Sequence, residues 1–199
     1  KSLYREVRFM VHDAMIAIDL PDGSRTLILR EIEIARAKKH ARANRVYGYS
    51  HFTPATGLSG DRDTAAAQST VECLRRNGII SVIGDRTLPL LYVDEMQSAG
   101  IHVELDAEIG VADRRMKDAD EVANLRKAQA VTEEVMRLAC ETVGRATSDA
   151  QGQLHLEGEI LTSHRVRTII DTFLLERNFF NPPSIVAGGS DGGDCHELG

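Results

Sequence analysis

The alternation of helix and strand patterns between residues 61 and 105 limits the possible folds more than any other feature of the chain. A helical pattern that Asp61 or Asp63 can cap runs to Arg76, and Asn77-Gly78 ends it because glycine accepts a left-handed conformation. Its apolar face is Ala67, Thr70, Val71 and Leu74. A buried strand (79–83), a helix (87–99) and a further strand (101–105) follow. This order predicts an α/β fold with parallel strands in a mixed sheet, joined by right-handed crossovers.

The preceding residues predict a β-hairpin. Two apolar or β-branched runs, Ala14–Leu20 and Thr26–Arg30, flank the turn sequence Pro21-Asp22-Gly23-Ser24. Proline sets the turn and glycine tolerates a positive φ there. We expect a helix over Glu31–Ala43 and a short strand over Val46–Tyr49 to continue the α/β pattern.

A shift in composition after Asp113 predicts a boundary between two domains, 1–113 and 114–199. Residues 114–121 are almost wholly polar, which is typical of a linker that enters a helix, and Asp118 or Asp120 can cap that helix. Apolar residues then keep helical spacing from Val122 to about Val143. A second helix is expected near Glu157 to Arg177.

Composition and charge exclude several classes of function. The net charge of -6, with no block of like charges, gives no support for nucleic-acid binding. No apolar run is long enough to cross a membrane. The three cysteines, Cys73, Cys140 and Cys195, are widely spaced and form no CxxC pair, so neither a disulfide framework nor a zinc ribbon is expected. We therefore expect a cytoplasmic protein. The chain starts with Lys and stops at Gly in a loop, so both ends look cut.

The last part of the chain reads as a strand beginning near Ile185, a glycine loop over Gly188–Gly193, and then His196. The loop could cradle a phosphate through its backbone amides. It lacks the lysine and the Ser/Thr of a P-loop, so a flexible turn is the better interpretation.

Together these elements resemble a known family. The joint reads Arg115-Met-Lys117-Asp-Ala-Asp-Glu121-Val-Ala-Asn-Leu-Arg126-Lys-Ala128, and Ile185-Val-Ala-Gly188 leads to His196. This order is similar to that of Xaa-Pro dipeptidases, aminopeptidase P and creatinase. In that family a creatinase-like N-terminal domain with a mixed sheet precedes an α+β pita-bread catalytic domain. The resemblance covers nearly the whole chain, and its second part corresponds to the opening helices and first strand of the pita-bread domain.

The resemblance implies hydrolysis of the bond before proline, with two divalent metal ions, Mn or Co, in the full-length protein. The amide nitrogen before proline carries no hydrogen, so a dimetal site that polarises the carbonyl suits this substrate. His196 matches the family's histidine that hydrogen-bonds the substrate or passes a proton. The family's metal ligands follow this point of the chain, so we assign no metal ligand and no substrate-binding residue, and we expect this chain alone to be metal-free and inactive. A homodimer is also implied.

Two other functions stay open. A creatinase-like amidinohydrolase shares the architecture and works without metal, with its histidine as the base. A non-catalytic pita-bread homologue would bind peptides or protein partners instead. Residues beyond Gly199 would separate these functions, since only the peptidases need the full set of carboxylates.

The remaining candidate residues have simpler explanations. Cys195 could be a nucleophile, but adjacent residues on an extended chain point to opposite sides, so a passive thiol is expected. Asp61 and Asp63 could share a metal ion, although helix capping explains them. Arg114 and Arg115 are expected to be solvated, although a joint between domains often makes local salt bridges. The other histidines show no metal-binding spacing, and surface or capping roles are expected for His12, His40, His51, His102, His155 and His164.

Overall fold

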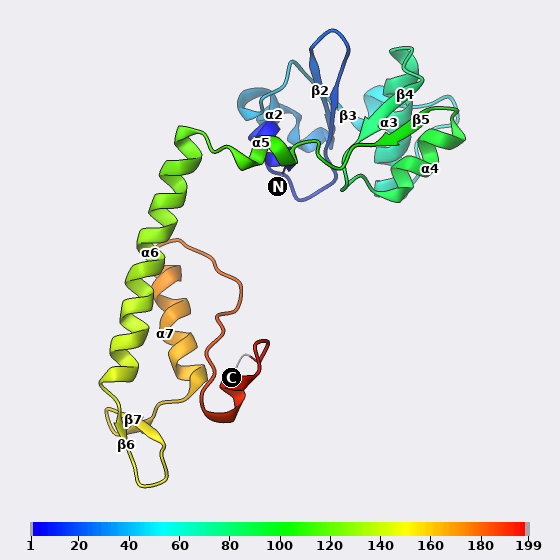
Figure 1. The fold of residues 1–199 in the computed structure, drawn as a ribbon. Helices are drawn as coiled ribbons and strands as arrows, with labels where there is room; N and C mark the ends of the chain where they lie inside the picture. Colours follow the sequence, from blue (N-terminus) through cyan, green and yellow to red (C-terminus); the bar gives the residue numbers. More distant parts are fainter. Residues whose placement is uncertain (1, 198–199) are drawn as a thin grey trace. The chain divides into compact units, whose positions relative to one another are not determined.

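The structure is a computed structural model that describes residues 2–197, and the chain divides into two units, Lys1–Met116 and Lys117–Gly199 (Figure 1). The domain division expected after Asp113 falls inside a short helix, α5 (Val111–Arg115), and the boundary between the domains stays a prediction. No helix in the described part of the chain has the length and apolar character that a membrane span needs.

Unit 1 is built on a three-stranded mixed sheet. Strands β1 (Ile16–Asp19) and β2 (Arg25–Leu29) are antiparallel, with Ile16 opposite Ile28, and β3 (Arg45–Gly48) lies parallel to β2 on its other side. The predicted hairpin is confirmed, since Gly23 has a φ of 78° and Asp22 accepts a hydrogen bond from the Ser24 amide.

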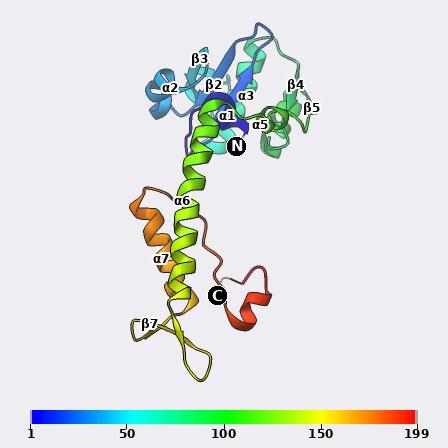
Figure 2. The ribbon, with the colours of Figure 1, turned by 60° about the vertical axis from the view of Figure 1, so that its left-hand side comes forward.

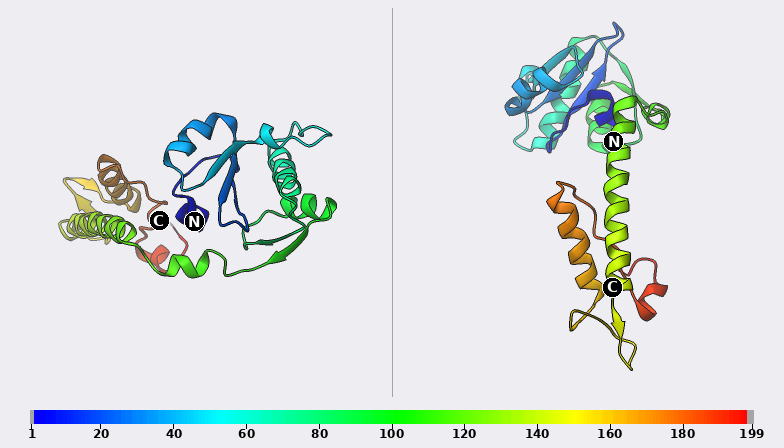
Figure 3. Two further views of the ribbon diagram at one scale, coloured as in Figure 1. Left: turned by 90° about the horizontal axis from the view of Figure 1, so that it is seen from above. Right: turned by 90° about the vertical axis from the view of Figure 1, so that its left-hand side faces the viewer.

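The sheet is covered on both faces, as Figure 2 and the left view of Figure 3 show. Successive side chains of a strand point to opposite faces. Leu27 and Leu29 belong to the core on the face covered by α1 (Ser2–Val7) and α2 (Ile34–His40). Ile28 belongs to the core on the other face, which is covered by η2 (Tyr49–Phe52) and α3 (Arg62–Arg76). These three residues are fully buried, and the central strand therefore joins two hydrophobic cores.

Helix α3 agrees with its prediction at both ends and along its face. The Asp61 side chain accepts a hydrogen bond of 2.9 Å from the Thr64 amide and so caps the helix. Gly78 follows the last turn with a φ of 68°. The predicted apolar face is buried throughout, at Ala67, Thr70, Val71 and Leu74.

Strands β4 (Ser81–Gly84) and β5 (His102–Leu105) are parallel, as predicted, and α4 (Leu90–Ser98) connects them. They form a separate two-stranded sheet and do not continue the mixed sheet of β1–β3. The strand predicted at 79–83 forms over Ser81–Gly84, but the prediction that it is buried is wrong. Only one face of β4 is covered, so Val82 packs on the core while Ile83 remains 62% exposed.

The predicted helix over Glu31–Ala43 is shorter than expected. It consists of the 3-10 turn η1 (Glu31–Glu33) followed by α2, which ends at His40. Helix α4 likewise begins at Leu90 rather than at Thr87, because the Asp85 carboxylate accepts hydrogen bonds from the Thr87 amide and hydroxyl in a local turn.

Unit 2 is a pair of antiparallel helices, α6 (Ala119–Gly144) and α7 (Ser163–Glu176), that lie side by side in Figure 1 and in the right view of Figure 3. The start of α6 is a capping box. The Asp118 carboxylate accepts from the Glu121 amide at 2.9 Å, and the Glu121 carboxylate accepts from the Asp118 amide at 3.0 Å. The small core of this unit consists of Val135, Leu161, Val166 and Leu174.

A three-stranded meander precedes α7 and was not predicted. It comprises β6 (Thr147–Ser148), β7 (Leu154–Leu156) and β8 (Glu159–Ile160). The helix expected to begin near Glu157 therefore begins at Ser163, capped by the Thr162 hydroxyl. Glu157 and Gly158 both have a positive φ, which turns the chain between β7 and β8 and is incompatible with a right-handed helix.

The segment after α7 runs back along the helix pair to η3 (Gly189–Gly193). The strand expected from Ile185 is not formed, because no strand in the described residues lies beside it. A strand needs a neighbour for its backbone hydrogen bonds. The Arg167 guanidinium, which donates to the carbonyl of Val186 at 3.3 Å, holds this segment near α7.

Candidate functional site

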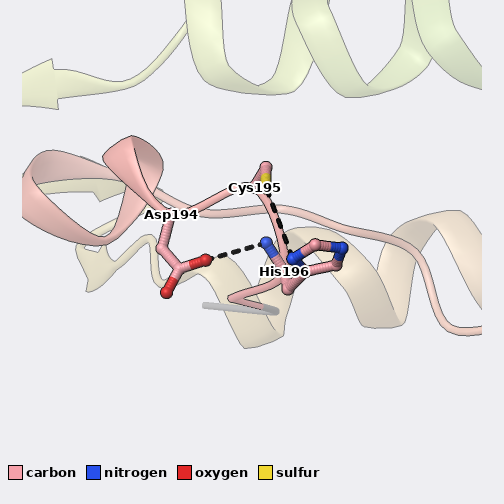
Figure 4. A group of neighbouring side chains, drawn as sticks. All are labelled: Asp194, Cys195 and His196. Atoms are coloured by element: carbon pink, nitrogen blue, oxygen red, sulfur yellow. Dashed lines mark hydrogen bonds between the residues drawn. The ribbon is translucent and has the colours of Figure 1, made fainter.

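Three side chains with potential metal-ligand atoms, Asp194, Cys195 and His196, lie close together in a turn after η3 (Figure 4). Gly189 opens η3 with a φ of 61°, a conformation that glycine adopts without strain. Just after η3, the His196 amide donates to the Asp194 Oδ1 atom at 3.0 Å. This hydrogen bond closes the turn, and all three side chains are exposed.

The turn brings Cys195 and His196 together. The Cys195 Sγ atom lies 3.3 Å from the His196 Nδ1 atom, and which of them donates depends on the histidine tautomer. The expectation that these neighbours point to opposite sides is wrong, because it assumed an extended strand and the chain turns here instead. A thiol and an imidazole at this distance can exchange a proton or share a metal ion.

The donors present do not fit the two-metal site that the resemblance implies. Within residues 2–197, Asp194, Cys195 and His196 are the one group of three or more potential ligands that lie close together. This group contains a single carboxylate, whereas the site that the resemblance implies needs a full set of carboxylates. A thiolate is also a soft ligand, while Mn²⁺ favours oxygen donors. The described residues therefore do not build that site.

Unit 1 contains an open cavity of about 520 Å³ next to the start of α3. Asp13 lies between two arginines there, 2.9 Å from the Arg30 guanidinium and 3.9 Å from that of Arg62. The Tyr49 hydroxyl donates to the carbonyl of Ala14, and burial raises the pKa of Tyr49 to about 12. Tyr49 is therefore a neutral hydrogen-bonding group here rather than an acid or base at neutral pH. The described residues that line the cavity carry charges of both signs.

Asp61 and Asp63 also line this cavity, and the structure supports the capping explanation for Asp61. The Thr64 hydroxyl and amide both donate to the Asp61 carboxylate, and these hydrogen bonds hold the pKa of Asp61 below its usual value. A shared metal ion at Asp61 and Asp63 is not supported, since they form no ligand group of three.

Three of the other histidines contact neighbouring groups or line the cavity of unit 1. His51 stacks on the Tyr47 ring at 4.2 Å, and His12 lines the cavity of unit 1. His155 is half-buried and lies 3.0 Å from an Asp149 carboxylate oxygen, a contact that its spacing did not predict. In the joint, Arg115 forms a local salt bridge with Glu108 at 3.1 Å.

No protein-family model matches the sequence, and no curated protein sequence matches it. Solved structures do match the fold. The Xaa-Pro dipeptidase from Bacillus anthracis is 13% identical, with a TM-score of 0.66 over 88% of this chain and 42% of its own. The prolidase from Pyrococcus horikoshii OT3 is 13% identical, with a TM-score of 0.54 over 86% of this chain and 42% of its own. The prolidase from Pyrococcus furiosus is 15% identical, with a TM-score of 0.53 over 85% of this chain and 42% of its own.

These matches confirm the predicted fold class. The chain has the mixed α/β fold of the N-terminal portion of prolidases, and it spans about two fifths of the length of the solved structures that it matches. At this identity the likeness concerns the fold alone, so the role of His196 stays a prediction.

Proposed function

We propose that this chain is the N-terminal portion of an Xaa-Pro metallopeptidase. The observation that supports the proposal is the similarity of fold to an Xaa-Pro dipeptidase over 88% of the chain, which includes residues of both units. The polar joint and the two helices that follow it add to this support, since the sequence of the joint already resembles that family.

The chemistry of the substrate explains the architecture that we propose. The nitrogen of an Xaa-Pro bond carries no hydrogen, so recognition cannot rely on donation from that amide. When bound, two divalent ions, Mn or Co, would polarise the scissile carbonyl and activate water. Residues outside this chain would hold these ions. In this proposal His196 contacts the substrate as a donor or acceptor of a proton, a task suited to an imidazole near neutral pH.

The same proposal includes a homodimer in the cytoplasm. Three free cysteines, of which Cys140 and Cys195 are exposed, are compatible with a reducing compartment. Light scattering of the purified protein would determine its oligomeric state.

The decisive experiment compares the 199-residue chain with the product of its complete parent reading frame. Both are incubated with Mn²⁺ and an Ala-Pro or Gly-Pro dipeptide, and Ala-Ala serves as the control substrate. We expect hydrolysis of the proline dipeptides by the longer product only, and its reduction in a His196→Ala variant of that product.

Hydrolysis of Ala-Pro by the 199-residue chain would contradict the expectation that this chain is inactive. A longer product that binds proline peptides but cleaves none would favour the non-catalytic homologue, and creatine hydrolysis without metal would favour the amidinohydrolase.

A further inference from the structure

The turn at residues 194–196 carries a donor set of its own. A carboxylate, a thiol and an imidazole come from three consecutive residues, and their ligand atoms all lie within 4.8 Å of one another. All three are exposed, so an ion can reach them without any opening of the fold.

The separation of the sulfur and the nitrogen is suited to a tetrahedral metal ion. Zinc binds a cysteine sulfur at about 2.3 Å and a histidine nitrogen at about 2.0–2.1 Å, so two such ligands at a tetrahedral angle stand about 3.5 Å apart. The Cys195 Sγ and His196 Nδ1 atoms are 3.3 Å apart. One ion can therefore contact both atoms once it replaces the hydrogen bond between them.

Asp194 provides a third donor from the same turn. Its Oδ1 atom accepts the amide hydrogen of His196, which holds a carboxylate oxygen within 4.8 Å of the other two ligand atoms. Figure 4 shows the second oxygen directed away from Cys195 and His196, so the carboxylate must rotate before that oxygen can bind the same ion. A carboxylate oxygen completes the mixed sulfur, nitrogen and oxygen set that zinc accepts, and water can occupy the fourth position at this exposed site.

We propose that Asp194, Cys195 and His196 bind one thiophilic divalent cation of the zinc class. This site is distinct from the oxygen-rich two-metal site of the peptidases. It uses the imidazole of His196, which cannot bind the cation and exchange a proton with a substrate at the same time, but its test does not require peptidase activity. The alternative is a hydrogen-bonded thiol–imidazole pair that binds no ion, and the experiment below separates the two.

The test uses the reduced, EDTA-treated 199-residue chain. Zinc binding is measured by calorimetry, and Co²⁺ then replaces zinc as a spectroscopic probe. We expect one ion per chain and a near-ultraviolet thiolate-to-Co²⁺ band. Cys195→Ala should abolish the band, and His196→Ala should weaken binding by more than about tenfold. Asp194→Asn, which keeps an acceptor oxygen for the His196 amide, should weaken binding less.

Matched variants make the result specific. Cys140→Ser and His164→Ala remove an exposed thiol and an exposed imidazole from helices α6 and α7, and binding should remain unchanged in both. The proposal is overturned by the absence of saturable zinc binding, by a Co²⁺ spectrum without the thiolate band, or by an equal loss in Cys140→Ser and Cys195→Ala. None of these readouts depends on peptidase activity, so the peptidase proposal can fail separately.

Discussion

The Nε2 atom of His155 lies 3.0 Å from the Oδ2 atom of Asp149, across the turn that joins β6 to β7. The other oxygen of Asp149 accepts hydrogen bonds from the amides of Gln151 and Gln153, at 2.9 and 2.8 Å. The hydrogen bond from His155 and these backbone hydrogen bonds lower the pKa of Asp149. One carboxylate thus fixes both the turn and the start of the next strand.

This lowered pKa predicts a specific pH dependence. The folded pKa of Asp149 lies below the unfolded value of about 3.9, so its carboxylate stabilises the fold above that pH. The stabilisation is lost as the pH falls through the folded pKa. Asp149→Asn should lower the melting temperature at pH 6 and change it little at the acid end of the range. Glu159→Gln, at an exposed position of β8, is the control. The prediction is contradicted if the melting temperatures of the two variants change with pH in the same way.

Removal of the capping box should destabilise unit 2. Asp118→Ala deletes the side-chain oxygen that accepts the Glu121 amide, and such a change costs about 1 kcal/mol. Urea unfolding followed by circular dichroism measures this loss. Asp120→Ala removes a neighbouring acid of the same first turn without removing the cap, and it should cost less. Equal losses would show that charge, rather than the cap, matters.

Truncation of a buried side chain of α3 should strongly destabilise unit 1. Leu74 is 2% exposed, so Leu74→Ala leaves a cavity and should cost about 2–5 kcal/mol of unfolding free energy. Leu90 is 80% exposed at the start of α4, and Leu90→Ala should change stability by less than about 0.5 kcal/mol. Denaturant titration of both variants tests this contrast, and a similar effect of the two changes would refute it.

The three thiols should react at different rates. Burial raises the pKa of Cys73 to about 11, so this thiol is both shielded and protonated at neutral pH. Cys140 and Cys195 are exposed and should react quickly with a disulfide reagent, while Cys73 should react only after denaturation. Mass spectrometry of the labelled peptides identifies each site. Rapid labelling of Cys73 in the folded protein would contradict its burial.

The sequence was sufficient to predict the elements whose signals are local. Asp61 and Gly78 mark the two ends of α3, and the turn at Pro21-Asp22-Gly23-Ser24 marks the hairpin. In both cases the residue type alone determines the backbone conformation, through a cap or a positive φ. These signals do not require knowledge of what packs against the element.

Predictions that depend on a neighbour were less successful. An apolar run such as 79–83 shows that a strand can form, but it does not show whether both faces are covered, and Ile83 is exposed. The stretch from Ile185 has strand-forming residues without a neighbouring strand in the described part of the chain. The meander could have been found, because Asp149 and Gly152 mark one turn and Glu157-Gly158 marks another.

The candidate site was only partly accessible from sequence. His196 was selected through a family resemblance, whereas its contact with Cys195 depends on a turn that follows η3. The glycines at 192 and 193 were a signal for that turn, since an extended strand is weakened by glycine. Three consecutive donor residues after a glycine-rich segment deserve consideration as a local chelating group.

The capping box of α6 has a consequence for the evolution of such chains. Its two hydrogen bonds join residues of a single helical turn, Asp118 and Glu121, and neither bond needs a residue from unit 1. A helix that begins in this way can start at the same residue behind a different leading sequence. Gene fusion or recombination at this joint could therefore exchange the preceding domain while the helix retains its starting point.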